Sequence, residues 1–250
     1  MREDRKRRIC ELLKGIETGD PESVRVVSPD RYVQHNPQTR EGGEGLAALF
    51  KRLAASSPRV NIVRIFSDQD FVFGHTEYDF DTRRIGFEIF RFEGEYTVEH
   101  WDNIQPRRGP NPSGHSMVDG PTEAEDAEAS ELNRERVRAF VSEVLIEGRL
   151  ELLEVYLSVD DYTEHNPDRG DGLASLRDWL SEAGRVDYQR LHRVFADGNF
   201  VLAVSEGRLN DVHTSFFDLF RLEAGRLVEH WDTIEAVPPR DQWLNDNGKF

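Results

Sequence analysis

The chain lacks several features that would place it in a specialised class of proteins. It has a single cysteine, Cys10, among 250 residues, which excludes an intramolecular disulfide and a cysteine-based zinc cage. No apolar stretch approaches the roughly 20 residues that cross a bilayer, and the charged start leads into an amphipathic pattern rather than a signal-peptide core. We therefore expect no membrane association and a cytoplasmic protein whose fold depends on its apolar cores.

Clustered positive charge is also missing. The formal net charge is −16 at pH 7, and the basic residues are interspersed with acidic ones. A face that binds nucleic acid needs clustered cations. The sequence therefore predicts no nucleic-acid partner.

What the chain does contain is an internal repeat. Val-Glu-His-Trp-Asp occurs at 98–102 and at 228–232, and His-Asn-Pro occurs at 35–37 and at 165–167, both 130 residues apart. A constant offset across two motifs indicates that a whole domain was duplicated. The stretch between the copies is rich in proline, glycine and charge, so we expect it to bury little and to cross the surface. We place the first copy at 1–108, the linker at 109–129 and the second copy at 130–250.

Within each copy, helical patterns precede strand patterns. Apolar residues recur at helical spacing over 9–16 and 132–145, a short second helix is expected before each His-Asn-Pro, and a third at 44–55 and 173–183. Strand patterns follow at 60–66, 71–78, 85–92 and 96–104, and again at 186–195, 200–208, 212–222 and 227–234. This order predicts an α+β fold in which N-terminal helices cover one face of a curved, mainly antiparallel sheet.

Several of these motifs together resemble a known family. The segments 32–37 and 162–167, 87–91 and 217–221, and the repeated Val-Glu-His-Trp-Asp resemble the SnoaL-like polyketide cyclase family of the nuclear transport factor 2-like superfamily. The resemblance implies two tandem cone-shaped α+β barrels, each enclosing an apolar pocket. It also implies an aldol ring closure without a cofactor, with Asp102 or Asp232 of the last strand as the acid/base. Those cyclases carry a histidine where this chain has Glu88 and Asp218, and this departure puts a polyketide substrate in question.

The alternation of side chains along a strand indicates a site independently of the resemblance. His230 and Asp232 share one face of their strand, and burial together with a neighbouring imidazole would tune such a carboxylate for proton transfer. The candidate catalytic residues are Asp232, His230, Asp218 and His165 in the second copy and Asp102, His100, Glu88 and His35 in the first. The candidate pocket residues are Trp231, Trp101, Tyr162, Tyr32, Phe216 and Phe220.

Some of these residues also have a purely structural interpretation. The tryptophans, Trp101 and Trp231, can serve as core or rim packing because they bury a large area. The histidines before Asn-Pro can satisfy loop groups, since the backbone there is held extended. We expect Glu99 and Glu229 on the opposite, solvent-facing side of the strand.

Three functions remain open at this point. The first is a cofactor-independent lyase, isomerase or cyclase that removes a proton beside a carbonyl, with Asp232 as base. The second is a non-catalytic pocket protein for a small hydrophobic molecule, or a dimerisation module. The third, which the linear spacing does not support, is a mononuclear metal site using His35, His100 and a carboxylate; the first two require no metal or cofactor. We also expect the two copies to pair through their sheets as an intramolecular pseudo-dimer, and further homodimerisation is left open.

Overall fold

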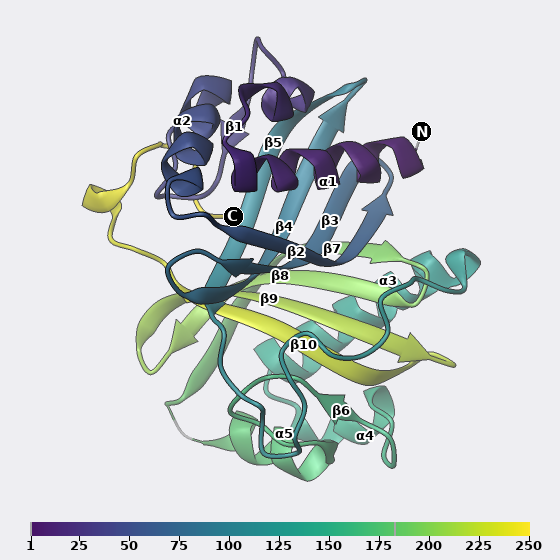
Figure 1. The fold of residues 1–250 in the computed structure, drawn as a ribbon. Helices are drawn as coiled ribbons and strands as arrows, with labels where there is room; N and C mark the ends of the chain where they lie inside the picture. The colour runs from purple at the N-terminus through teal and green to yellow at the C-terminus, as the bar shows by residue number, and fades with distance from the viewer. Residues whose placement is uncertain (1, 183) are drawn as a thin grey trace. The chain divides into compact units, whose positions relative to one another are not determined.

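The protein forms two compact units in the computed structural model, which describes residues 2–182 and 184–250. Unit 1 comprises Met1–Pro106 and Pro238–Phe250, and unit 2 comprises Arg107–Val237. Each unit contains one five-stranded sheet and its helices (Figure 1). The predicted α+β class is therefore confirmed. None of the described helices combines the length and apolar character needed to cross a membrane.

Unit 1 places its helices on one face of its sheet. Its elements are α1 (Arg2–Thr18), a 3₁₀ turn (Pro21–Val26), β1 (Val33–Gln34), α2 (Gly42–Ala54), β2 (Arg59–Asp68), β3 (Phe71–Asp79), β4 (Arg83–Glu93) and β5 (Tyr96–Pro106). The sheet order is β1-β5-β4-β3-β2, with β1 parallel to β5 and the other pairs antiparallel. Ile9 and Leu13 of α1 share one buried core with Val72 and Phe90 of the sheet. The face of the sheet that carries Phe90 is therefore the inner, helix-covered face.

Unit 2 repeats this plan. Its elements are α3 (Ser130–Phe140) with a π-helical turn (Val141–Ile146), a 3₁₀ turn (Leu150–Leu152), α4 (Leu153–Tyr156), β6 (Thr163–Glu164), α5 (Gly172–Ser181), β7 (Val186–Asp197), β8 (Phe200–Leu209), β9 (Val212–Glu223) and β10 (Arg226–Ala236). The sheet order is β6-β10-β9-β8-β7, and β6 runs parallel to β10. Phe140 of α3 packs with Phe220 of β9 in the core between helices and sheet.

The structure departs from the sequence prediction at three points. The strands β1 and β6 were not predicted, because two residues are too few to show a period. Leu132, predicted to pack, is 70% exposed; its neighbour Asn133 is buried instead and donates its side-chain amide to the Gly198 carbonyl at 2.9 Å, which turns the packed face by one residue. The predicted end of the third helix of the second copy, at 183, lies outside the described residues, and α5 ends at Ser181.

The segments that follow β5 and β10 are docked rather than loose. Asn111, in the predicted linker, is buried in unit 2 and donates its amide to the Glu164 carbonyl at 2.6 Å. In unit 1 the amide of Asn247 donates to the carbonyl of Gln34, the equivalent residue, at 3.1 Å. Polar side chains thus satisfy backbone groups that the two-residue strands leave unpaired. The limits 1–108, 109–129 and 130–250 remain our proposal for the duplicated segments, whereas the folded units have the limits given above.

Candidate functional site

The inner face of the unit 2 sheet carries a histidine held between two carboxylates. His230 of β10 lies 2.9 Å through Nδ1 from Glu164 Oε1 and 3.1 Å through Nε2 from Asp218 Oδ1. Burial lowers the pKa of His230, but the charge of Glu164 and the hydrogen bonds to both carboxylates outweigh it and raise this pKa to about 9. At neutral pH the ring is therefore an imidazolium that donates from both nitrogens.

Arg169 joins this histidine to a third carboxylate. Its Nη2 donates to Asp232 Oδ2 at 2.7 Å, and its Nε lies 3.1 Å from Glu164 Oε2. Asn166 donates its amide to both oxygens of Asp232, at 2.9 and 2.7 Å. Burial raises the pKa of Asp232 against the attraction of Arg169, whereas the pKa of Glu164 falls to about 2, because Arg169 and His230 outweigh its burial. We call Glu164, Arg169, Asp218, His230 and Asp232 the inner cluster of unit 2.

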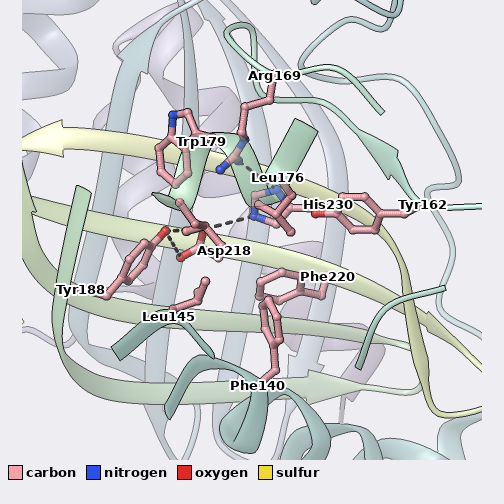
Figure 2. A pocket seen from close by; sticks show the side chains of 11 residues that line it. Phe140, Leu145, Tyr162, Arg169, Leu176, Trp179, Tyr188, Asp218, Phe220 and His230 are labelled. Carbon is pink, nitrogen blue, oxygen red and sulfur yellow. Dashed lines mark hydrogen bonds and ion pairs between the residues drawn. The ribbon is translucent and has the colours of Figure 1, made fainter. Parts of the chain in front are cut away.

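A pocket with a cavity volume of about 10 Å³ opens onto this cluster (Figure 2). Figure 2 shows Asp218 bonded to both His230 and Tyr188, whose hydroxyl lies 3.2 and 3.3 Å from the two carboxylate oxygens. Asp232 is not among the lining residues, so a molecule in the pocket meets Asp218 and His230 first. The lining residues are Phe140, Leu145, Tyr162, Arg169, Leu176, Trp179, Leu180, Tyr188, Asp218, Phe220 and His230.

Unit 1 has an equivalent cluster with fewer charges. His100 Nε2 lies 2.7 Å from Glu88 Oε2, and its Nδ1 lies 2.9 Å from the side-chain oxygen of Gln34. Tyr78 donates its hydroxyl to Glu88 Oε1 at 2.6 Å, and burial raises the pKa of this glutamate above its ordinary range. Asn36 donates to Asp102 Oδ2 at 2.6 Å. We call Gln34, Glu88, His100 and Asp102 the inner cluster of unit 1.

The opposite, outer face of each sheet carries a second histidine with a glutamate. In unit 1 His35 stacks on Trp101 at a ring distance of 4.5 Å and contacts Glu99 at 3.0 Å. Arg91 donates to the other oxygen of Glu99 at 2.7 Å. Despite partial burial, the hydrogen bonds from His35 and Arg91 lower the pKa of Glu99 to about 2.

Unit 2 repeats this outer arrangement. His165 stacks on Trp231 at 4.7 Å and contacts Glu229 at 2.8 Å, and Arg221 donates to Glu229 at 2.7 Å. Glu229 is 5% exposed. Both glutamates lie on the face opposite the inner cluster, as expected, but the expectation that they face solvent was wrong for Glu229, whereas the side chain of Glu99 is 18% exposed.

The structure thus separates the predicted site residues into two sets. His230, Asp218 and Asp232, and likewise His100, Glu88 and Asp102, come together on the inner faces. The histidines and tryptophans of the outer faces (His35, His165, Trp101 and Trp231) do not reach them, because they belong to the other side of the strands. Of the predicted pocket residues, Tyr162 and Phe220 line the pocket, whereas Phe216 packs behind it on Tyr188 at 4.3 Å. Tyr32 is buried near the inner cluster of unit 1, with its ring 6.4 Å from that of His100.

Sequence reasoning missed Glu164 and Arg169. Glu164 could have been found, because Tyr162, Glu164 and Asn166 alternate toward one face. Arg169 gave no such signal: it lies in a loop and replaces the Thr39 of the first copy.

Two sets of described residues have the composition of a metal site, and neither contains His35. They are Glu88, His100 and Asp102 in unit 1 and Asp218, His230 and Asp232 in unit 2, each with ligand atoms within 4.8 Å of one another. In unit 2 the guanidinium of Arg169 already contacts both Asp232 and His230, and its charge opposes a metal ion there. The predicted set of His35, His100 and a carboxylate is not assembled, because the two histidines face opposite sides of the sheet.

Comparison with known proteins adds structural neighbours only. No protein-family model matches the chain, and no curated protein matches it either. A protein from Kribbella flavida provisionally named a ketosteroid isomerase is similar at 21% identity and a TM-score of 0.39, over 44% of this chain and 84% of that one. An LEH-like epoxide hydrolase from M. tuberculosis is similar at 23% identity and a TM-score of 0.36, over 42% of this chain and 84% of that one. A provisionally named polyketide cyclase from Acidithiobacillus ferrooxidans is similar at 18% identity and a TM-score of 0.36, over 41% of this chain and 87% of that one.

Proposed function

We propose that the protein is a small-molecule enzyme that performs acid–base chemistry beside a carbonyl in the pocket of unit 2. The observation that carries the proposal is a carboxylate and an imidazolium, Asp218 and His230, in hydrogen-bond contact at the wall of an otherwise largely apolar pocket. Paired titratable groups at the edge of an apolar pocket are the usual setting of proton transfer. The cavity of about 10 Å³ is close to the size of one water molecule, so the proposal requires the lining side chains to move apart when a small carbonyl compound enters.

Each polar residue of the pocket has a place in such a reaction. Asp218 takes a proton from the carbon beside the carbonyl; the C–H electron pair forms a carbon–carbon double bond and the carbonyl oxygen becomes an enolate. The fixed charge of Arg169 and the imidazolium of His230 stabilise this oxygen. Return of the proton to another carbon gives an isomerase, and attack of the enolate on a second carbonyl gives a cyclase or, in reverse, a lyase. Asp232 and Glu164 hold Arg169 and His230 in place.

Isotope exchange tests this assignment without a known substrate. Small cyclic ketones and diketones are incubated with the protein in D₂O, and loss of the proton beside the carbonyl is followed by NMR. We expect Asp218→Asn to slow exchange by about 10²–10⁴, and the exposed Asp178→Asn of α5 to leave it unchanged. If Asp232 is itself the base, as the motif alone suggested, Asp232→Asn abolishes exchange while Asp218→Asn retains it.

A second function is favoured by the pairing within the site. Both oxygens of Asp218 already accept hydrogen bonds from Tyr188. This is expected of a pocket residue that contributes to binding and takes no part in proton transfer. A compound that binds the pocket, with no exchange above the buffer rate in any carbonyl tested, would replace the enzyme by a non-catalytic carrier of small hydrophobic molecules.

A further inference from the structure

Asp102 is a buried carboxylate whose own copy supplies no arginine to it. In unit 2 the equivalent Asp232 receives the guanidinium of Arg169 at 2.7 Å. The first copy has Thr39 at that position, and Asp102 is nevertheless only 5% exposed. A carboxylate so far from water needs a cation or several hydrogen bonds to remain ionised.

The cation comes from Pro238–Phe250, the segment that follows the last strand of the second copy and belongs to unit 1. Lys249 donates from Nζ to the main-chain oxygen of Asp102 at 2.8 Å and lies 3.5 Å from its Oδ1. The side chain of Lys249 is 2% exposed. Asp102 therefore has an amide donor, Asn36, and a cation, as Asp232 has Asn166 and Arg169.

The segment is held against the loop that follows β1. Leu244 donates its main-chain amide to the Pro37 carbonyl at 2.8 Å, and Asn245 donates its side-chain amide to the carbonyls of Asn36 and Thr39 at 2.7 and 3.0 Å. The ring of His35 contacts the carbonyl of Gly248 at 2.9 Å. The segment thus docks on Thr39, where the second copy has its arginine.

Backbone pairing explains why the ammonium binds at this place. The parallel pairing of β1 with β5 ends with the His35 amide on the His100 carbonyl. The next carbonyl along that edge of β5 is that of Asp102, and it would be left without a strand partner. Lys249 satisfies this carbonyl and neutralises the side chain of the same residue.

We infer that Lys249 is a positioning residue of the unit 1 site: the segment 238–250 brings its ammonium to Asp102, where it takes the role that Arg169 has in unit 2. The inference goes beyond the proposed function, which concerns the pocket of unit 2. It means that the inner cluster of unit 1 is complete only while the segment after the last strand of the second copy is docked on it.

Amine labelling of the full chain tests this contact, because the chain has only four lysines. The native protein is treated briefly with an acetylating N-hydroxysuccinimide ester, and each lysine is quantified by mass spectrometry. We expect Lys249 to react at least on the order of tenfold more slowly than the exposed Lys51. Asp102→Asn should release it by a similar factor, whereas Asp232→Asn, the matched change in unit 2, should leave it protected. Equal labelling of Lys249 and Lys51, or unchanged protection in Asp102→Asn, would overturn the inference.

If Asp102→Asn does not fold, a second pair of variants tests whether the charge of Lys249 holds the segment 238–250 in place. Lys249→Met keeps the apolar stem and removes the charge, and Lys249→Arg keeps the charge. Amide hydrogen exchange at Leu244 and His35 should accelerate on the order of tenfold or more in Lys249→Met and be restored in Lys249→Arg, with Lys51→Met as the control. If Lys249→Met leaves these amides as protected as in the native chain, the apolar stem alone holds the segment and the inference fails.

Discussion

In unit 2 the inner histidine lies between two carboxylates, Glu164 and Asp218, whereas in unit 1 it lies between the amide of Gln34 and the single carboxylate of Glu88. The unit with the additional carboxylate has a loop arginine, Arg169, where unit 1 has Thr39 and takes its cation, Lys249, from the segment 238–250. Because an unpaired buried charge is costly, a cation beside each inner aspartate is expected. The comparison teaches that each inner aspartate is paired with one cation, which comes from a nearby loop in unit 2 and from a segment distant in sequence in unit 1.

The tyrosines that hydrogen-bond to the two inner clusters, Tyr78 and Tyr188, offer a second comparison between the units. Tyr78 reaches Glu88 from β3, but Tyr188 reaches Asp218 from β7, which is the counterpart of β2. The two tyrosines are therefore not equivalent in sequence. A donor to the carboxylate is present in both units, although no aligned position carries it.

The largest expected effect comes from breaking the additional pair of unit 2. Arg169→Thr leaves Asp232 buried without its cation and leaves Glu164 with His230 alone, so we expect a loss of about 3–5 kcal/mol in the free energy of unfolding of unit 2. Urea denaturation followed by hydrogen exchange in β9 and β10 measures it. The double variant Glu164→Gln with Arg169→Thr copies the residues of unit 1 and should cost less than Arg169→Thr alone. A double variant as unstable as the sum of the singles would contradict the pairing.

The next largest effect is expected on the stability of the protein in acid. Glu164 has its pKa lowered to about 2, so its contribution of about 3 kcal/mol is present above pH 4.5 and is lost as the pH falls toward 2. Glu88 has its pKa raised, so its protonation on acidification favours the folded state. The pKa of Asp232 in unit 2 is raised as well, and the pKa of each outer glutamate is lowered, that of Glu99 in unit 1 to about 2, so acid acts on both units. Hydrogen exchange between pH 5 and 3 should show the protection of β10 falling with acid, and Glu164→Gln should make this protection less dependent on pH; the same dependence in the variant would contradict the role of Glu164.

Alkaline solution should weaken unit 2 by a similar amount. The pKa of His230 is raised to about 9, so its stabilisation, again about 3 kcal/mol, is complete below pH 6.5 and disappears as the pH rises through 9. NMR titration of the ring reports this pKa directly. Asp218→Asn removes one of its two carboxylate partners and should lower the pKa; an unchanged value would show that Asp218 does not hold the proton.

The smallest effect is expected from the two phenols. Tyr78→Phe removes a 2.6 Å hydrogen bond to a buried carboxylate and should cost roughly 1.5–3 kcal/mol. Tyr188→Phe removes longer bonds, of 3.2 and 3.3 Å, and should cost about 1 kcal/mol. Thermal unfolding resolves the difference, and a larger cost for Tyr188→Phe would reverse the proposed order.

The repeat and the strand periods predicted the two α+β units, because burial of one face leaves a pattern that can be read along the chain. The same alternation placed His230 and Asp232 on one face and Asp218 beside them. It could not place Arg169, whose loop has no period, or Lys249, which lies 147 residues from its partner Asp102. The sequence also suggested His35 and His165 as site residues. Each follows a two-residue strand, and so short a strand does not show which side of the sheet the next residue faces.

The segment 238–250 belongs to unit 1, and the segment from 107 to 237 belongs to unit 2. The boundaries of the folded units therefore do not follow the boundaries of the repeats along the chain. Unit 1 is assembled from two separate stretches, whereas unit 2 is one stretch, Arg107–Val237. Dividing the polypeptide at the repeat boundary would therefore give a first fragment that lacks Lys249 and the segment 238–250 that carries it. A circular permutant that starts at residue 107 and joins residue 250 to residue 1 would instead encode each unit as one uninterrupted sequence. That rearranged chain is the appropriate starting point for separating the two units.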